Sequence, residues 1–117
     1  MLQEKANDLG RVIGQSDEYK TMKRTSEALG EDREAVTLLR ELEQLRQQAG
    51  QMIEGGEQPT AEMESRLDAL LGQVQANATY QRAIVAQDNF DKLMLRVNEW
   101  ISEGIRKGAQ SSIITLG

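Results

Sequence analysis

The stretch Asn77–Lys107, NATYQRAIVAQDNFDKLMLRVNEWISEGIRK, decides the predicted fold of this chain. Its apolar residues recur every three or four positions, the spacing that places side chains on one face of an α-helix. The central row of that face is Ala83, Ala86, Phe90, Leu93, Val97 and Trp100. Asn77 is placed to cap the helix, because its side chain can accept a hydrogen bond from a free backbone N–H. About 29 helical residues would form a rod about 43 Å long, which needs other helices or a second chain to cover it.

The residues before this stretch predict four shorter helices. Apolar residues in the segment 2–13 again step by three and four, which indicates a short first helix. Ser16, Asp32 and Thr60 are predicted N-caps of the next three helices. The segment GGEQPT (55–60) holds two glycines and the only proline of the chain, and it predicts the turn of a helical hairpin. We therefore expect an all-α, five-helix array or bundle with a long C-terminal helix.

The length of 117 residues predicts one domain. We place a single all-helical domain at residues 1–107 and a tail at residues 108–117. The tail, GAQSSIITLG, has lost the helical periodicity. We expect it to be extended or flexible, and its apolar residues make it a candidate docking segment.

Composition excludes several kinds of chemistry. The chain has no cysteine, so it can form no disulfide and no cysteine-ligated metal centre. It has no histidine, which is the commonest general base and transition-metal ligand. The net charge of −5 disfavours direct binding to nucleic acid or to an anionic membrane. No segment approaches the ~20 apolar residues of a membrane span. We predict no cofactor and expect a cytoplasmic protein.

The 19 Asp and Glu residues leave one enzymatic alternative, a carboxylate-based metal enzyme. Helical two-metal sites usually combine inward-facing Glu with Glu-x-x-His motifs, and this chain has no histidine to build one. Most of its acids fall away from the apolar rows, as expected for solvated helix faces. A second charged feature is the group Lys20, Lys23 and Arg24. These cations could meet RNA or an acidic partner, but cations near a helix C-terminus also complement the helix dipole, and we favour that explanation.

Two apolar faces offer more surface than a thin bundle covers. One lies in segment 33–54, whose apolar residues keep a heptad-like spacing, and the other lies in segment 78–107. The candidate contact residues for a partner or a second copy are Leu38, Leu42, Leu45, Met52, Phe90, Leu93, Val97, Trp100, Ile113 and Ile114. We predict a homo-oligomer and favour a dimer, because two-fold pairs are the commonest closed assembly.

Several short phrases of the sequence carry a family resemblance. They are Leu9-Gly10 with Ile13, Ser16-x-Glu18-Tyr19, Asp32-x-Glu34-Ala35, Asn77-x-x-Tyr80, Ala86-Gln87-x-x-Phe90, and Val97-Asn98 with Ile101 and Ile105. In order and spacing they resemble the YlbF/YmcA family of small bacterial helical proteins, including its YheA-like branch. The resemblance covers nearly all of residues 2–107.

The resemblance implies an all-helical domain that associates with itself or with relatives. The best-understood members of that family regulate competence, sporulation and biofilm formation, within a complex that modulates the endoribonuclease RNase Y. Some members of that complex hold iron–sulfur clusters through cysteines, a property that does not carry over to a chain without cysteine. The resemblance brings no catalytic residue. We predict a non-catalytic regulatory adaptor that acts through helix-mediated protein–protein contacts, possible partners being the proteins of an RNA-processing complex. The alternative is a structural helical oligomer with no regulatory role.

Overall fold

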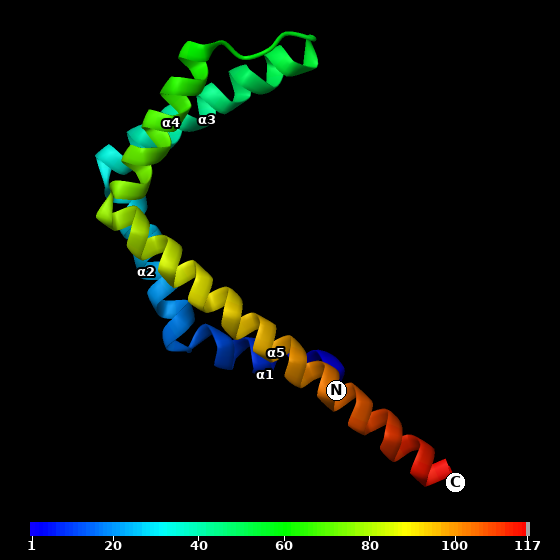
Figure 1. Cartoon of the computed structure of the whole chain (residues 1–117). Helices are drawn as coiled ribbons and strands as arrows, with labels where there is room; N and C mark the ends of the chain where they lie inside the picture. The colour runs from blue at the N-terminus through cyan, green and yellow to red at the C-terminus, as the bar shows by residue number, and fades with distance from the viewer. Residues whose placement is uncertain (117) are drawn as a thin grey trace.

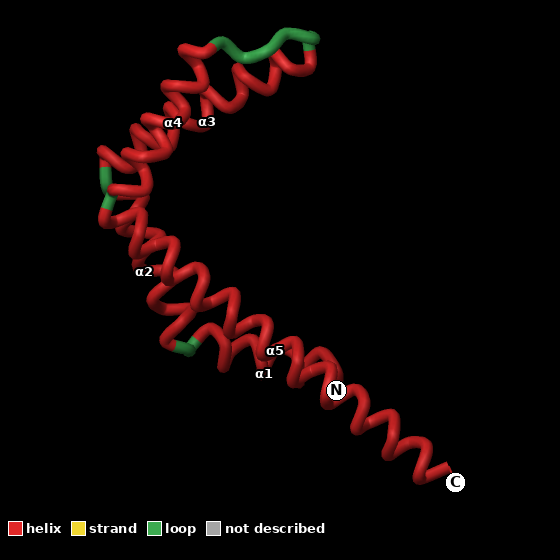
Figure 2. The backbone as a smooth tube through the Cα atoms, in the orientation of Figure 1, coloured by secondary structure: helices red, strands yellow, loops and turns green. Residues whose placement is uncertain are grey.

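The structure is a computed structural model that describes the backbone of residues 1–116 and the side chains of residues 1–110. It contains five helices, namely α1 (Leu2–Gly14), α2 (Asp17–Glu31), α3 (Arg33–Glu54), α4 (Ala61–Ala76) and α5 (Ala78–Leu116). Residues 1–116 form no β-strand (Figure 2). The predicted all-α fold with five helices and a long last helix is therefore confirmed.

The five helices form two arms that meet at an elbow (Figure 1). The hairpin arm consists of α3 and α4, which pack against each other in antiparallel fashion. The long arm consists of α1, α2 and α5, with α2 packed along the first half of α5. The molecule measures 69 × 36 × 20 Å, so its smallest dimension is only about two helix diameters. A body this thin can bury few side chains.

The core of the hairpin arm is aliphatic. Leu42 from α3 packs with Leu70 and Val74 from α4, and all three side chains are buried. The partly buried side chains around this cluster are Leu38, Leu39, Leu45, Leu67, Leu71 and Tyr80. Tyr80 belongs to the first turn of α5, so the cluster also ties the hairpin arm to the long arm.

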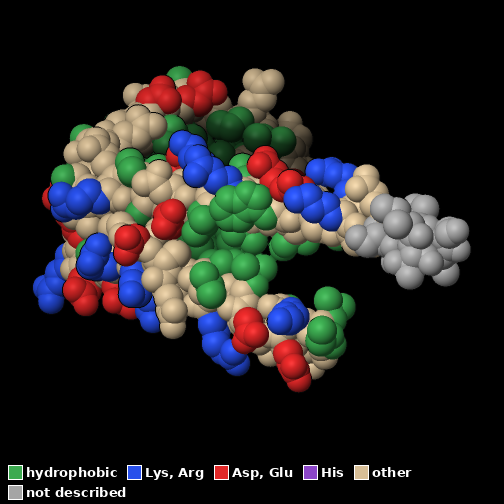
Figure 3. Space-filling model, turned by 90° about the horizontal axis from the view of Figure 1, so that it is seen from below, with side chains coloured by type: hydrophobic (Ala, Val, Ile, Leu, Met, Phe, Trp, Pro, Cys, Tyr) green, Lys and Arg blue, Asp and Glu red, His purple; other side chains and the backbone are tan. Residues whose placement is uncertain are grey.

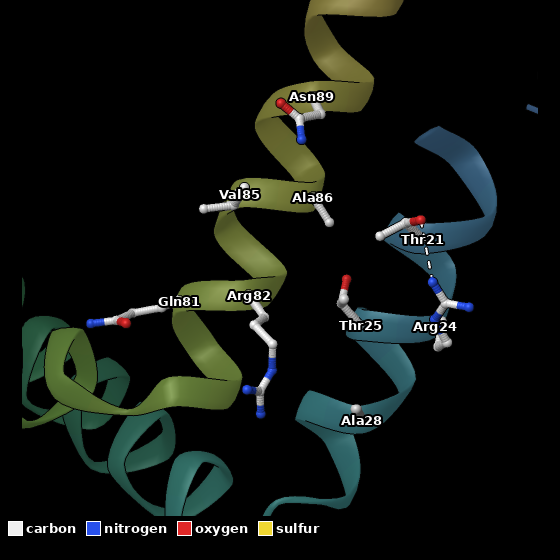
Figure 4. Close-up of a pocket in the computed structure, with 9 residues that line it drawn as sticks. All are labelled: Thr21, Arg24, Thr25, Ala28, Gln81, Arg82, Val85, Ala86 and Asn89. Atoms are coloured by element: carbon white, nitrogen blue, oxygen red, sulfur yellow. Dashed lines mark hydrogen bonds between the residues drawn. The ribbon is translucent and has the colours of Figure 1, made fainter. Parts of the chain in front are cut away.

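The core of the long arm lies between α2 and α5. Ala86 and Val97 of α5 are buried. Ala86 lies opposite Thr21 and Thr25 of α2 (Figure 4), and its small side chain lets the two helices approach closely. The rings of Tyr19 from α2 and Phe90 from α5 lie 5.6 Å apart, tilted by 60°, which is within the favoured range for an aromatic pair. This pair uses half of the four aromatic residues of the chain.

Four N-caps predicted from the sequence are present. The side chains of Ser16, Asp32, Thr60 and Asn77 each accept a hydrogen bond from the backbone N–H three residues later. The donor–acceptor distances are 3.1, 3.0, 3.2 and 2.9 Å respectively. Each cap satisfies a donor that a helix start leaves free, and this is why α2 to α5 begin where they do.

The turn of the hairpin arm follows α3 at Gly55 and Gly56. Gly56 has a φ of +83°, a backbone conformation that glycine adopts without steric cost. The backbone N–H of Glu57 donates to the carbonyl of Met52 at 2.8 Å and closes the end of α3. The predicted hairpin turn at residues 55–60 is therefore confirmed.

The predicted end of the last helix near Lys107 is wrong, because α5 continues to Leu116. Residues 108–116 were expected to be extended since their apolar periodicity is lost. Apolar periodicity reports which side chains a helix buries, and a helix without it can still form its backbone hydrogen bonds. Gly108 also does not end the helix, because glycine in a helix costs only about 1 kcal/mol relative to alanine. Whether residues 108–117 form a flexible tail separate from a domain at 1–107 stays a prediction.

Candidate protein-interaction surfaces

The acidic side chains do not gather into a metal site in the part of the chain whose side chains are described. No group of three or more Asp or Glu residues there is arranged to hold a metal ion. Four acids instead pair with basic side chains at the surface: Asp8 with Arg11, Glu41 with Arg66, Asp88 with Lys92, and Glu103 with Lys107. Exposed pairs of this kind contribute about 0–1 kcal/mol each. The carboxylates of these pairs are therefore solvated side chains on the outer faces of the helices.

A groove of about 640 Å³ runs between α2 and α5 (Figure 4). Its floor consists of small side chains, and Thr21 and Thr25 of α2 lie opposite Ala86 of α5. The complete lining is Thr21, Arg24, Thr25, Ala28, Gln81, Arg82, Val85, Ala86 and Asn89. Small side chains on facing helices leave a shallow hollow that a third helix or an extended segment can fill.

Two guanidinium groups flank this groove. Arg24 donates from its Nη2 atom to Thr21 Oγ1 at 3.4 Å, and Arg82 extends from the opposite helix (Figure 4). Neither arginine takes part in an ion pair among the described side chains. The groove therefore combines a largely apolar floor with two positive charges, although the chain as a whole is acidic.

The far end of the long arm exposes further apolar side chains. We call α1 together with residues 98–110 of α5 the distal end. Its large exposed apolar residues are Leu2, Leu9, Val12, Trp100, Ile101 and Ile105. In Figure 3, α1 projects from the body and a gap separates it from α5. Green apolar side chains are visible on both sides of that gap.

The contact residues predicted from the sequence fall into different environments. Leu42 and Val97 are buried inside the chain and leave almost no surface for a partner. The half-buried members of the set are Leu38, Leu45, Met52, Phe90 and Leu93. Trp100 is 59% exposed, while the side chains of Ile113 and Ile114 lie outside the described residues. Whether a partner contacts any of these residues stays a prediction.

Sequence reasoning missed the exposed residues of α1 as contact candidates. The periodicity of Leu2, Leu9 and Ile13 was visible, and it predicted a helix with an apolar face. That much of this face stays exposed in the described part of the chain, with Leu2 at 85%, is a property of the tertiary arrangement. The same holds for Ile101 and Ile105, which share the periodicity of buried residues earlier in α5.

At the elbow, the caps of two helices lie together. Asp32, the cap of α3, accepts a hydrogen bond from the backbone N–H of Ala35 at 3.0 Å, and Asn77 and Thr79 at the start of α5 line the same hollow as Asp32. The hydrogen bond from Ala35 first, and then the polar side chains of Thr79 and Asn77, hold the pKa of Asp32 below its ordinary value of 3.8. Ionised Asp32 therefore lies where the starts of α3 and α5 meet.

We expect Asp32 to make the folded state sensitive to acid. Because its pKa is lower in the folded chain than in the unfolded chain, its contribution is complete above about pH 4 and is lost as the pH falls through the folded value. Asp32→Asn keeps a capping side chain but cannot titrate. Thermal melts followed by circular dichroism from neutral pH to about pH 3 should show a shallower acid loss for this variant. Asp68→Asn, at an exposed position of α4, is the matched control, and equal acid losses for both variants would contradict the role of Asp32.

The part of the chain that the structure describes includes no helix that is both long and apolar enough to cross a membrane. The family model described as control of competence regulator ComK, YlbF/YmcA, matches residues 2–106. A UPF0342 protein of Leuconostoc citreum is 22% identical over 100 residues, which cover 86% of this chain and 85% of that protein. A UPF0342 protein of Streptococcus thermophilus is 32% identical over 84 residues, covering 72% of this chain and 75% of the relative.

A solved structure has the same fold. The crystal structure of Bacillus subtilis RicA in complex with RicF matches with a TM-score of 0.82 and 18% sequence identity, covering 92% of this chain and 96% of that chain. The family match runs from the start of α1 into α5 as far as residue 106, and it agrees with the phrases from Leu9-Gly10 to Val97-Asn98 that carried the resemblance. The chain belongs to the YlbF/YmcA family of competence-control regulators.

Proposed function

We propose that this protein is a non-catalytic regulatory adaptor that acts by binding other proteins through exposed helix faces. The observation that carries this proposal is the large share of apolar side chains left open on a body only 20 Å thick. Exposed apolar patches on a folded protein mark interaction sites. Membership of a family of regulators supports the regulatory part, and RicA, which shares the fold, was crystallised with a protein partner, RicF.

The partner surface that we favour is the groove between α2 and α5. An amphipathic helix laid into such a groove would cover the small side chains of its floor, as in other helix-in-groove complexes. Arg24 and Arg82 would then each be free to pair with a carboxylate of the partner, and Arg–carboxylate pairs fix geometry as well as adding energy. We infer a partner segment that is helical and bears acidic residues on its rim.

The process that we propose is messenger-RNA processing by an RNase Y-type complex in the cytoplasm of a bacterium. The resemblance to the YlbF/YmcA family supports this assignment, and the net charge of −5 fits an adaptor that binds protein rather than RNA. Homo-oligomerisation, with a dimer favoured, belongs to the same proposal. A structural oligomer without a regulatory role is the competing function.

Capture of the tagged full-length protein from extract of its native cell, followed by mass spectrometry, tests the adaptor function. We expect a specific protein at near-stoichiometric yield, lost when Arg24 and Arg82 are both replaced by glutamate. The matched control replaces Arg33 and Arg46, exposed on α3, and should retain the partner. Deletion of the gene should also shift transcript ends. Recovery of the bait alone, together with unchanged transcript ends, would contradict the adaptor function.

We also expect the purified protein to carry no stoichiometric metal. The carboxylates of its ion pairs are solvated and paired with Lys or Arg, and the chain lacks histidine and cysteine. Elemental analysis by inductively coupled plasma mass spectrometry measures this directly. One tightly held transition-metal ion per chain after dialysis against a chelator would revive the metal-enzyme alternative.

A further inference from the structure

The hairpin tip, which we define as residues 47–65, carries most of the excess negative charge of the chain. It comprises the end of α3, the turn and the start of α4, and it lies at the opposite end of the hairpin arm from the elbow (Figure 2). The tip holds no Lys or Arg, and its acids are Glu54, Glu57, Glu62 and Glu64. Since the net charge of the chain is −5, four of the five units lie here.

The four carboxylates of the tip have no basic partner within the described part of the chain. All four side chains are exposed, and none forms an ion pair there. Arg66, the first base after the tip, pairs instead with Glu41 at 3.4 Å. Glu62 and Glu64 lie in the first turn of α4, where the helix dipole favours negative charge. Glu54, however, lies in the last turn of α3, where negative charge is unfavourable, so helix stability does not account for the acidity of the tip.

A mainly apolar hollow, which we call the tip hollow, lies at the same place. Its volume is about 450 Å³, and its apolar lining comes from Met52 of α3 and Met63 of α4. The remaining lining residues are Gln48, Gln51, Gly55 and Glu57. Methionine side chains are flexible and polarizable, so they can adapt to the shape of an apolar side chain from a partner.

The carboxylates of the tip form a rim around the tip hollow. Glu57 itself lines the hollow. Glu62 and Glu64 are the sequence neighbours of Met63, and because consecutive residues of a helix point about 100° apart, they lie on the two flanks of its face. The tip therefore presents an apolar centre with a negative rim.

This combination of shape and charge selects the occupant. The phosphates of RNA and the headgroups of anionic lipids would be repelled by the rim. No three acids among the described side chains are arranged to hold a metal ion. An apolar centre with a negative rim is instead complementary to a segment that carries an apolar side chain between Lys or Arg residues. A helix has that form when apolar and basic residues share its turns at a spacing of three and four.

We propose that the hairpin tip binds a basic amphipathic helix of a partner protein. An apolar side chain of that helix enters the tip hollow between Met52 and Met63, and its Lys or Arg residues reach the four carboxylates of the rim. The inference rests on the proposed adaptor function and adds a second partner of opposite charge, because the α2–α5 groove is flanked by Arg24 and Arg82. The two surfaces belong to different arms and share no lining residue, so one molecule can hold both partners at once.

A synthetic probe tests the role of the rim. The probe is a fluorescein-labelled peptide of leucine and lysine, about 14 residues or four helical turns long, with its leucines at helical spacing. Its binding to the purified full-length protein is followed by fluorescence anisotropy at about 50 mM salt, where exposed charges are weakly screened. The rim variant should raise the Kd of the probe about 10-fold or more, and it combines Glu54→Gln, Glu57→Gln, Glu62→Gln and Glu64→Gln.

The matched control removes the same amount of charge elsewhere. It replaces four exposed acids outside the tip, and it should leave the Kd within about threefold of the original protein. These replacements are Glu4→Gln, Glu27→Gln, Glu31→Gln and Glu99→Gln. A second probe with glutamate in place of lysine should bind at least about 10-fold more weakly than the lysine probe. Circular dichroism verifies that each variant folds.

Two further measurements locate the bound probe. Met63→Gln keeps the length of the side chain but places an amide in the tip hollow, and it should raise the Kd about threefold or more. Carbodiimide crosslinking joins a lysine of the probe to a carboxylate that it contacts. Mass spectrometry of the digested product should then place the crosslinks on the four acids of the rim.

Equal losses of affinity in the rim variant and its control would overturn the inference, because the probe would then sense only net charge. Crosslinks outside the tip, or equal binding of the lysine and glutamate probes, would do the same. Because the α2–α5 groove of another copy is also basic, light scattering of the protein alone is needed. A molar mass that falls in the rim variant and not in the control would show that the tip binds a second copy instead.

The outcome is separable from that of the capture experiment. The probe is added to purified protein, so its failure to bind would leave the capture of a partner that depends on Arg24 and Arg82 unaffected. Conversely, a capture that returns the bait alone would contradict the adaptor function, while specific binding of the probe at the rim would still establish that the tip recognises a basic helix.

Discussion

Replacing Val97 by aspartate is expected to lower the free energy of unfolding by about 4 kcal/mol or more, which is the range for an unpaired charge placed in a core. Val97 is 4% exposed and is one of two buried residues in the described part of α5. An aspartate there would have to stay dehydrated or push away the side chains that cover it. Either outcome destabilises the packing around α5.

Urea denaturation followed by circular dichroism measures this effect, at one fixed protein concentration since self-association would add to the apparent stability. Leu95→Asp is the matched control. It introduces the same side chain two residues earlier, at a position that is 63% exposed, so helix propensity and net charge change equally. We expect the control to lose about 1 kcal/mol or less. Equal losses for both variants would mean that the burial of Val97 contributes little to the stability.

The second large effect is expected in the hairpin arm. Leu70→Ala should lower the free energy of unfolding by about 2–5 kcal/mol, because it removes a buried side chain and leaves a cavity. Leu70 is 3% exposed and packs with Leu42 and Val74. Few other side chains of this arm are buried, so few are placed to move into the cavity that the missing Leu70 side chain would leave. Small domains have total stabilities of about 5–15 kcal/mol, so the variant should be near the limit of folding.

The same urea titration tests this expectation. Ile53→Ala is the matched control in α3, since Ile53 is 63% exposed and its truncation should change the stability by about 0.5 kcal/mol or less. A Leu70→Ala variant as stable as Ile53→Ala would show that the hairpin arm does not fold around the cluster of Leu42, Leu70 and Val74.

Local signals predicted the helices well. Ser16, Asp32, Thr60 and Asn77 start helices because a cap requires only a side chain and a backbone N–H three residues away, and both are set by the sequence. Gly56 marks the hairpin turn for a similarly local reason, its positive φ. The end of α5 was missed because no comparable stop signal exists there, and apolar periodicity reports burial rather than helix continuation.

The contact surfaces were harder to predict from sequence. Val97 and Trp100 have the same periodicity and were both named as contact residues, yet one is buried and the other is exposed. The difference depends on how far along α5 the rest of the chain covers it, which is set by the tertiary arrangement and not by the periodicity of α5 itself. The groove between α2 and α5 depends likewise on small side chains from distant parts of the sequence facing one another.

The elbow has a mechanical consequence. Both chain connections between the arms pass through it as single residues, Asp32 between α2 and α3 and Asn77 between α4 and α5. The elbow is thus a fulcrum, and α3 with its 22 residues is a lever. Over the roughly 33 Å length of α3, a rotation of about 10° at the fulcrum displaces the hairpin tip by about 6 Å, which is about one helical turn. Since the chain has no cysteine, a pair of introduced cysteines carrying spin labels, one near each arm end, would record such a displacement as a change in their separation.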